Sequence, residues 1–206
     1  HISASGSNIF INASGNLLRL STDGELLEIK SLQDAGLPAD PIDLRWLDSG
    51  RLLVAGQHPA TIDICDTESW SCSPLPGPSI DRIQRQFKIL SEAKPGSWLL
   101  TDARGDALWR LEESAVELGE VLPQKTLAGA NGLAFDENGN PWVADTDNRR
   151  IVELLPAEGG QFITGREHSA VNELTIGERH YPMLIEHGPE GRWWVAQAAD
   201  FSQAHS

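Results

Sequence analysis

The chain has 206 residues, 16 of them basic and 30 acidic, and a formal net charge of −14. This balance argues against DNA, RNA and anionic lipid as partners, because each of them binds to a cationic protein face. An apolar content of 40% with seven Trp indicates a folded globular protein. No apolar run approaches the ~18 residues that cross a bilayer, so we expect no direct membrane insertion of this region.

A glycine is followed, four residues later, by the central apolar residue of a short strand at five places along the chain. The copies follow one another at intervals of 43 to 52 residues. A constant offset inside a loose period indicates one supersecondary unit copied along the chain. The pairs are Gly6 and Phe10, Gly50 and Val54, Gly96 and Leu100, Gly139 and Val143, and Gly191 and Val195.

In chain order, the copies are predicted to form short strands joined by polar turns, and the first copy is expected to begin late, without an inner strand. Its strands are expected at 9–11, 17–20 and 26–29. Those of the second copy are expected at 42–47, 52–55, 61–65 and 73–75. Those of the third are expected at 87–90, 98–101, 107–111 and 116–118. The fourth has 133–135, 142–144, 151–155 and 161–164, and the fifth has 183–186 and 193–196.

These units predict an all-β fold, a β-propeller of four-stranded antiparallel blades with about four and a half blades present. A single sheet of this size cannot bury both of its faces, whereas sheets repeated at this period stack around an axis. Runs such as Trp98-Leu99-Leu100 and Trp193-Trp194-Val195 suit strands that are covered on both faces. We expect one domain over 1–206, with blade repeats near 1–31, 40–77, 86–122, 131–165 and 181–206.

Two cysteines, Cys65 and Cys72, are the only ones in the chain. If the residues between them form a hairpin with a loop over 67–70, Asp66 faces Ser71 and the cysteines face each other as the next pair. Non-hydrogen-bonded pairs bring side chains closest, so a cross-strand disulfide is sterically plausible. Two free thiols are the alternative. A disulfide would place the protein in an oxidising compartment, either a bacterial periplasm or the cell exterior.

The stretch from Asn131 to Leu155 resembles an NHL repeat. The residues that match its pattern are Gly132, Leu133, Ala134, Asp136, Gly139, Asn140, Val143, Ala144, Asp145, Asn148, Arg150 and Ile151. The resemblance implies a six-bladed propeller. Closing such a ring would take ~60 further residues at this period, so we expect the chain to be a fragment of a longer protein.

Alternate connections of a meander fall at opposite ends of its strands, and one end is predicted to gather polar side chains around the axis. Asp102 and Asp145 share one repeat position there. Each is expected either to accept hydrogen bonds from its own turn backbone or to contact a ligand. The candidates for a ligand-binding face are Asn12, Gln57, His58, Asp102, Arg104, Asn131, Asp145, Asp147, Asn148 and Gln197.

Asn131-Gly132 is similar to the Asn-Gly with which gluconolactonase- and regucalcin-like propellers begin a first strand. The resemblance implies that Asn131 ligates a divalent metal, Ca²⁺ or Zn²⁺, together with a Glu and an Asp from other blades. The last copy departs from this pattern, since it has Tyr181-Pro182-Met183 where that family has its Asp. The alternative is that Asn131 supports the turn before Leu133.

The chain has no Gly-x-Ser-x-Gly motif and no phosphate-binding glycine loop, and no catalytic residue is assigned. We therefore expect a non-enzymatic binding or interaction domain without a cofactor, whose partner is a protein, a peptide or a saccharide. The alternative function is a metal-dependent, lactonase-like hydrolase with its site in the axial channel. A third hypothesis is a structural part of a larger protein, periplasmic or secreted and anchored through a segment ahead of His1.

Overall fold

The computed structural model describes residues 2–5, 8–13, 15–37, 41–47, 50–57, 60–75, 87–94, 96–102, 106–112, 119–169 and 180–199. They form four antiparallel sheets of four strands each and one sheet of two strands. We number these sheets as blades 1 to 5 in chain order.

Each blade is a meander in which consecutive strands pair. Blade 1 consists of β1 (Ile2–Ser5), β2 (Asn8–Ala13), β3 (Asn16–Ser21) and β4 (Leu26–Ser31). Blade 2 consists of β5 (Pro41–Leu47), β6 (Arg51–Gln57), β7 (Ala60–Asp66) and β8 (Cys72–Pro74). Blade 3 consists of β9 (Phe87–Lys94), β10 (Ser97–Asp102), β11 (Ala107–Glu112) and β12 (Gly119–Leu122). Blade 4 consists of β13 (Ala130–Phe135), β14 (Pro141–Asp145), β15 (Arg150–Pro156) and β16 (Phe162–Ser169), and blade 5 of β17 (His180–His187) and β18 (Trp193–Ala199).

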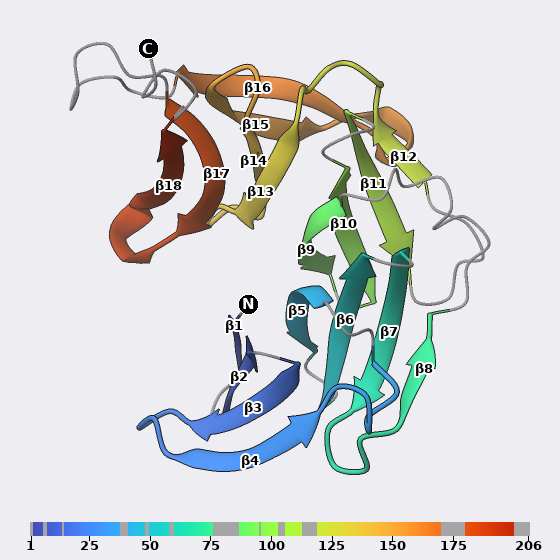
Figure 1. Ribbon diagram of the computed structural model, residues 1–206. Coiled ribbons are helices and arrows are strands. Elements are labelled where there is room, and N and C mark those ends of the chain that lie inside the picture. Colours follow the sequence, from blue (N-terminus) through green and yellow to red (C-terminus); the bar gives the residue numbers. More distant parts are fainter. Residues whose placement is uncertain are drawn as a thin grey trace, which may run out of the picture.

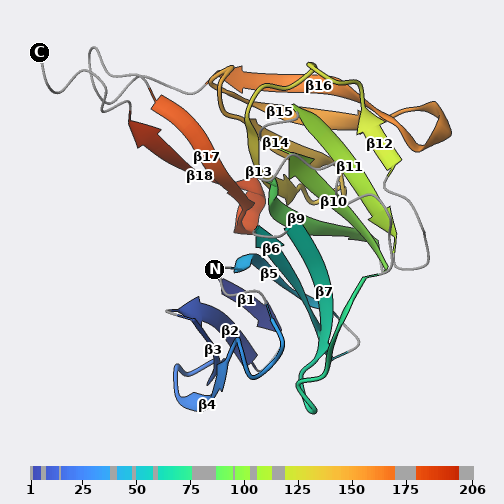
Figure 2. The same cartoon turned by 45° about the vertical axis from the view of Figure 1, so that its right-hand side comes forward.

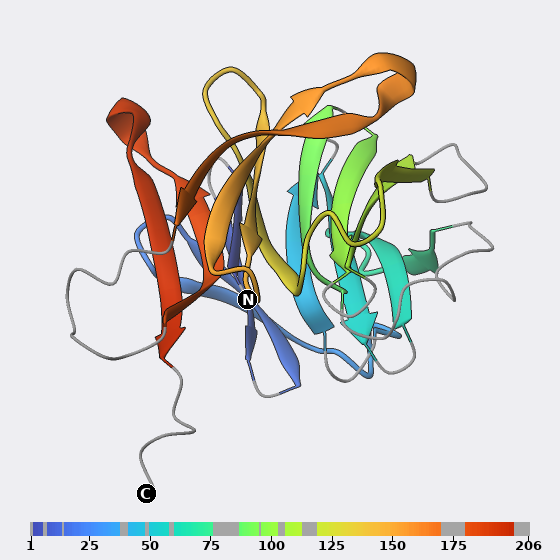
Figure 3. The same cartoon turned by 90° about the horizontal axis from the view of Figure 1, so that it is seen from above.

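The blades follow one another along an arc, with blade 1 at one end and blade 5 at the other (Figures 1 and 2). The first strands of successive blades contact one another, β1 with β5, β5 with β9, β9 with β13 and β13 with β17. Strands β8, β12 and β16 lie at the outside of the arc (Figure 1). Seen from above, blade 5 stands alongside blade 4 (Figure 3), in agreement with the contacts of β17 to β13 and β14. This arrangement confirms the β-propeller fold.

The core consists of separate apolar clusters between successive blades, as β10 illustrates. All six residues of β10 are buried, because its side chains alternate between two neighbouring blades. Trp98 and Leu100 pack with Leu53 of blade 2, whereas Leu99 packs with Leu133 of blade 4. An unbroken apolar run is therefore what this strand requires.

The sequence predicts that the run Trp193-Trp194-Val195 of blade 5 is covered on both faces, and Trp194 shows that it is not. Trp193 and Val195 are partly buried against blade 4, but Trp194 is 65% exposed and Leu184 of the paired strand is 51% exposed. The physical reason is the same alternation. Trp194 points away from blade 4, and that face is not covered in the part of the chain that the structure describes.

Two further expectations about strands are corrected. Blade 1 does have an inner strand, since Ile2–Ser5 pairs antiparallel with β2 from Ile2 opposite Ile11 to Ser5 opposite Asn8. The residues after Ile2 are small and mostly polar, so they show no apolar pattern that would predict a strand. This strand is held by its hydrogen bonds to β2 instead. The fourth strand of blade 3 is Gly119–Leu122, and residues 116–118 lie outside the described residues.

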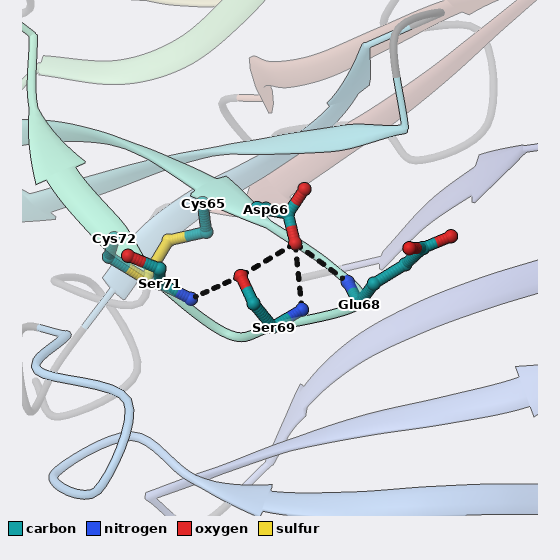
Figure 4. The surroundings of a disulfide bond; sticks show 6 residues. All are labelled: Cys65, Asp66, Glu68, Ser69, Ser71 and Cys72. Carbon is teal, nitrogen blue, oxygen red and sulfur yellow. Dashed lines mark hydrogen bonds between the residues drawn. A yellow bond between two sulfur atoms is a disulfide. The ribbon is translucent and has the colours of Figure 1, made fainter.

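The hairpin of blade 2 has the predicted register and disulfide. Cys65 lies opposite Cys72, the two form a disulfide with their Cα atoms 4.1 Å apart, and the Asp66 amide donates to the Ser71 carbonyl. Figure 4 shows that one Asp66 oxygen also accepts from the Glu68 amide and from the amide and hydroxyl of Ser69. These bonds, led by the one from the Ser69 amide, hold the pKa of Asp66 below its usual value. The charged aspartate thus closes the turn that aligns the cysteines.

Candidate functional site

Asn131 lies near the start of β13 with its side chain almost entirely buried, at 6% exposure. Its amide nitrogen donates to the Gly129 carbonyl at 2.9 Å and to the Thr146 hydroxyl at 2.8 Å. A carbonyl can only accept, so this contact fixes which end of the amide is nitrogen. The remaining atom, Oδ1, is buried and has no hydrogen-bond partner among the described residues. Buried acceptors of this kind usually bind water or a ligand.

Hydrogen bonds through Asn131 connect three blades. The Thr101 hydroxyl of blade 3 donates to the Asn131 carbonyl at 2.8 Å. The Thr146 hydroxyl, which accepts from the Asn131 amide, donates in turn to the Pro182 carbonyl of blade 5 at 2.7 Å. All four residues are buried. At the polar end of the propeller, blades 3, 4 and 5 are therefore connected by a continuous series of hydrogen bonds.

Gly132 follows Asn131 and lets β13 approach the next blade closely. A Cβ atom at this position would lie 2.8 Å from the Ile185 nitrogen and from the Leu184 Cα, and 3.0 Å from the Met183 oxygen. All three atoms belong to the β17 backbone. Residue 132 must therefore lack a side chain if the two strands are to pack at this distance.

Asp145 ends β14 with no exposed surface, and both of its carboxylate oxygens accept hydrogen bonds. The Ala128 amide donates to Oδ1 at 2.7 Å, Arg150 donates to Oδ2 at 2.7 Å, and the Asn148 amide contacts both oxygens. The bond to Asp145, first among several causes, raises the pKa of Arg150. Ala128 belongs to the connection from blade 3, so Asp145 fastens this connection as well as its own turn.

The other predicted ligand-face residues lie at varied depths. Asn12 is half-buried and donates to the Pro41 carbonyl at 3.1 Å, which links blades 1 and 2. Asp102 is buried, with 1% exposure, whereas Asp147 and Gln197 are exposed. His58, Arg104 and the side chain of Gln57 lie outside the described residues. The structure thus brings Asn131, Asp145 and Asn148 to one end of blade 4, and their role as a ligand face stays a prediction.

Thr101 and Thr146 are parts of this site that sequence reasoning did not single out. Neither is among the residues that match the repeat pattern. Thr146 meets Asn131 through the pairing of β13 with β14, and Thr101 meets it because blades 3 and 4 stack. Within the described part of the chain, no three side chains of His, Cys, Asp or Glu lie close enough to hold a metal ion. Among the same residues, no helix has the length and apolar character of a membrane span.

Comparison with known proteins finds relatives by structure and not by sequence. No family model matches the chain, and no curated protein sequence matches it. Virginiamycin B lyase from Staphylococcus aureus superposes with a TM-score of 0.65 at 15% identity, over 95% of this chain and 61% of that structure. A calcium-binding protein, regucalcin, from Agrobacterium tumefaciens gives 0.62 at 14% identity, over 92% and 62%. A chain of a nidogen/laminin complex gives 0.69 at 14%, over 95% and 70%.

This chain therefore spans between 61 and 70% of the length of the three structures. Identities near 15% establish a shared fold and nothing about activity. The chain is therefore, in fold, a β-propeller similar to these structures.

Proposed function

We propose that this protein is a binding domain that works outside the cytoplasm and presents the polar end of its propeller to a protein, peptide or saccharide partner. The observation that carries the proposal is the state of Asp145. Its two oxygens accept hydrogen bonds from three donors of its own blade and connection, so it stabilises this end of the blade instead of facing a substrate. The exposed side chains of Gln197 and of Asn148, whose amide nitrogen contacts Asp145, lie at the rim of this frame.

The disulfide supports the proposed location. Cys65–Cys72 closes a short hairpin, and such bonds persist in a periplasm or outside the cell, where thiols are not kept reduced.

Arrays of peptides and of glycans, probed with the labelled protein, test the binding role. We expect at least one class of probe to bind, and expect the double variant Asn148→Ala with Gln197→Ala to weaken that binding. Glu158→Ala, an exposed change in the turn between β15 and β16, is the matched control and should leave binding unchanged. Substrate screens that found turnover abolished by Asn131→Ala would contradict the proposal.

A metal-dependent hydrolase is the second candidate, and the unpaired Oδ1 of Asn131 favours it. A buried amide oxygen is a suitable ligand for Ca²⁺. The described residues supply this one oxygen and no cluster of carboxylates or histidines around it, so they do not by themselves make a metal site. If a metal does bind, Ca²⁺ or Zn²⁺ at micromolar concentration should raise the melting temperature of the protein and not that of Asn131→Ala. Equal melting temperatures with and without each metal would count against this candidate.

A further inference from the structure

A cavity of about 340 Å³ lies between blades 4 and 5, at the opposite end of β13 from Asn131. Its walls come from the turn between β13 and β14, the second half of β16, the end of β17 and the start of β18. Ligand cavities in proteins begin near ~300 Å³, and an engineered cavity of ~150 Å³ holds benzene. This cavity therefore accommodates a six-membered ring together with its substituents.

Aromatic rings form one corner of the cavity. Trp142 and Trp193 lie with their ring centroids 5.1 Å apart and their planes tilted by 47°. His168 stacks on Trp142 at 5.7 Å, and His187 meets Trp193 edge-on at 4.8 Å. Trp142 is 2% exposed and forms the floor, while His168 is exposed and Trp193 and His187 are partly exposed. Rings that are held by neighbours and still reachable offer a rigid apolar surface to a ligand.

Polar groups surround this corner in fixed orientations. Arg166 donates through Nε and Nη2 to the two oxygens of Glu153, each at 2.8 Å. This pairing sets the guanidinium 5.2 Å above the Trp142 ring and leaves Nη1 without a hydrogen bond among the described residues. Burial opposes the ionisation of Asp136, but bonds from Asn140, Trp142 and Asn138 prevail and lower its pKa.

The charges around the cavity disfavour ionic ligands. An anion would approach Arg166 only alongside the carboxylates of Asp136, Glu137 and Glu153. A cation would compete with Arg166 for the face of Trp142, where the guanidinium already lies. A neutral ligand with an apolar ring face and a polar rim meets neither obstacle.

We propose that this cavity binds a neutral saccharide, whose C–H face packs on the partly exposed ring of Trp193 and whose hydroxyl groups bond to Arg166, Glu137 and Asn138. Hydroxyl groups both donate and accept, so they suit a rim that mixes a guanidinium, carboxylates and an amide. The inference rests on the proposed binding role, and it names both a ligand class and a second location.

Titration calorimetry and tryptophan fluorescence, with the methyl glycosides of glucose, galactose, mannose and N-acetylglucosamine, test the proposal. At least one glycoside should bind at millimolar concentration. Trp193→Ala should weaken its binding by about tenfold or more, as for a buried aromatic anchor. The matched control is Trp194→Ala, which removes the adjacent, 65% exposed ring on the opposite face of β18 and should leave the affinity unchanged.

Asn138→Ala is the second variant, because its side chain is exposed in a turn and its loss should not affect folding. It should weaken binding by about threefold to tenfold through the loss of one hydrogen bond. The proposal is overturned if none of the four glycosides binds, if adenosine binds in their place, or if binding survives both Trp193→Ala and Asn138→Ala. Saccharide binding abolished by Asn148→Ala with Gln197→Ala, and not by Trp193→Ala, would overturn this location and leave the proposed function standing.

Discussion

Replacing Gly132 by Ala should separate blades 4 and 5 and lower the stability of the propeller. The new Cβ would lie 2.8 Å from two backbone atoms of β17, about 0.6 Å inside ordinary van der Waals contact. Its neighbours are main-chain atoms of a paired strand, which cannot rotate away as a side-chain end can. The strain must therefore be relieved by moving β13 and β17 apart.

The expected loss is ~2 kcal/mol of unfolding free energy. Overpacking of this kind costs ~1–3 kcal/mol, and contacts with rigid backbone belong near the upper limit. Alanine returns ~0.4–1 kcal/mol, because it restricts the unfolded chain more than glycine does. For a chain of about 200 residues, 1 kcal/mol corresponds to ~2–4 °C, so the melting temperature should fall by about 4–8 °C.

Urea denaturation and calorimetry measure this effect, and Gly165→Ala is the control. Gly165 lies in β16 of the same blade, and its Cβ would meet the side chains of Leu155 and Glu153 at 2.9 to 3.1 Å. Side chains give way more easily than the backbone of a paired strand, so this variant should lose less than Gly132→Ala does, ~1 kcal/mol. Gly132→Ala with wild-type stability, or a larger loss for Gly165→Ala, would refute the reasoning.

Three further predictions concern the disulfide, a buried carboxylate and the polar end of the propeller. Reducing Cys65–Cys72, which are separated by seven positions, should cost ~2.5 kcal/mol on the chain-entropy model, and denaturation with and without a reductant checks it; unchanged stability would contradict it. Hydrogen bonding to Arg166 is the main cause that holds the pKa of Glu153 below its usual value of 4.5. The contribution of Glu153 to stability should therefore be complete above pH 4.5 and should disappear as the pH falls through the lowered pKa. Stability measured between pH 3 and 6 should accordingly depend less on pH in Glu153→Gln, and identical profiles would argue against this role. Thr146→Val should lower the free energy of unfolding by ~1–3 kcal/mol, because it leaves the hydrogen-bond partners of Thr146 unpaired. The control Thr164→Val, at an exposed position, should lower it by ~0.5 kcal/mol or less. Equal losses for the two variants would contradict this prediction.

The sequence was sufficient to predict the blades where local pattern and tertiary environment agree. The strands around Val54 and Val143 are apolar because each is buried between two blades, and turn glycines with positive φ, such as Gly139 at 79°, separate them. The cysteine register followed from hairpin geometry. Ile2–Ser5 escaped prediction because it has little apolar pattern and is held by pairing with β2.

The candidate sites were less accessible to sequence reasoning. Asn131 could be singled out by its Asn-Gly pair, but its partner Thr101 lies 30 positions away. Pro182, which is connected to Asn131 through Thr146, lies 51 positions away. Both residues come near Asn131 only through blade stacking. The cavity behind Trp142 depends on the same stacking, since Trp193 comes from another blade. A pattern along one strand cannot show which side chains of the next blade will lie against it.

The connection that leads into β13 is fastened from both sides. Asp145 of blade 4 accepts from the Ala128 amide, and Asp106 of blade 3 accepts from the Gly129 amide at 2.9 Å. Whichever blade keeps this connection, blades 3 and 4 cannot part without breaking one of these two hydrogen bonds, and their backbone amides should exchange with deuterium as one cooperative unit. Where a connection between two blades is hydrogen-bonded to both of them in this way, we expect the two blades to open together and not one at a time.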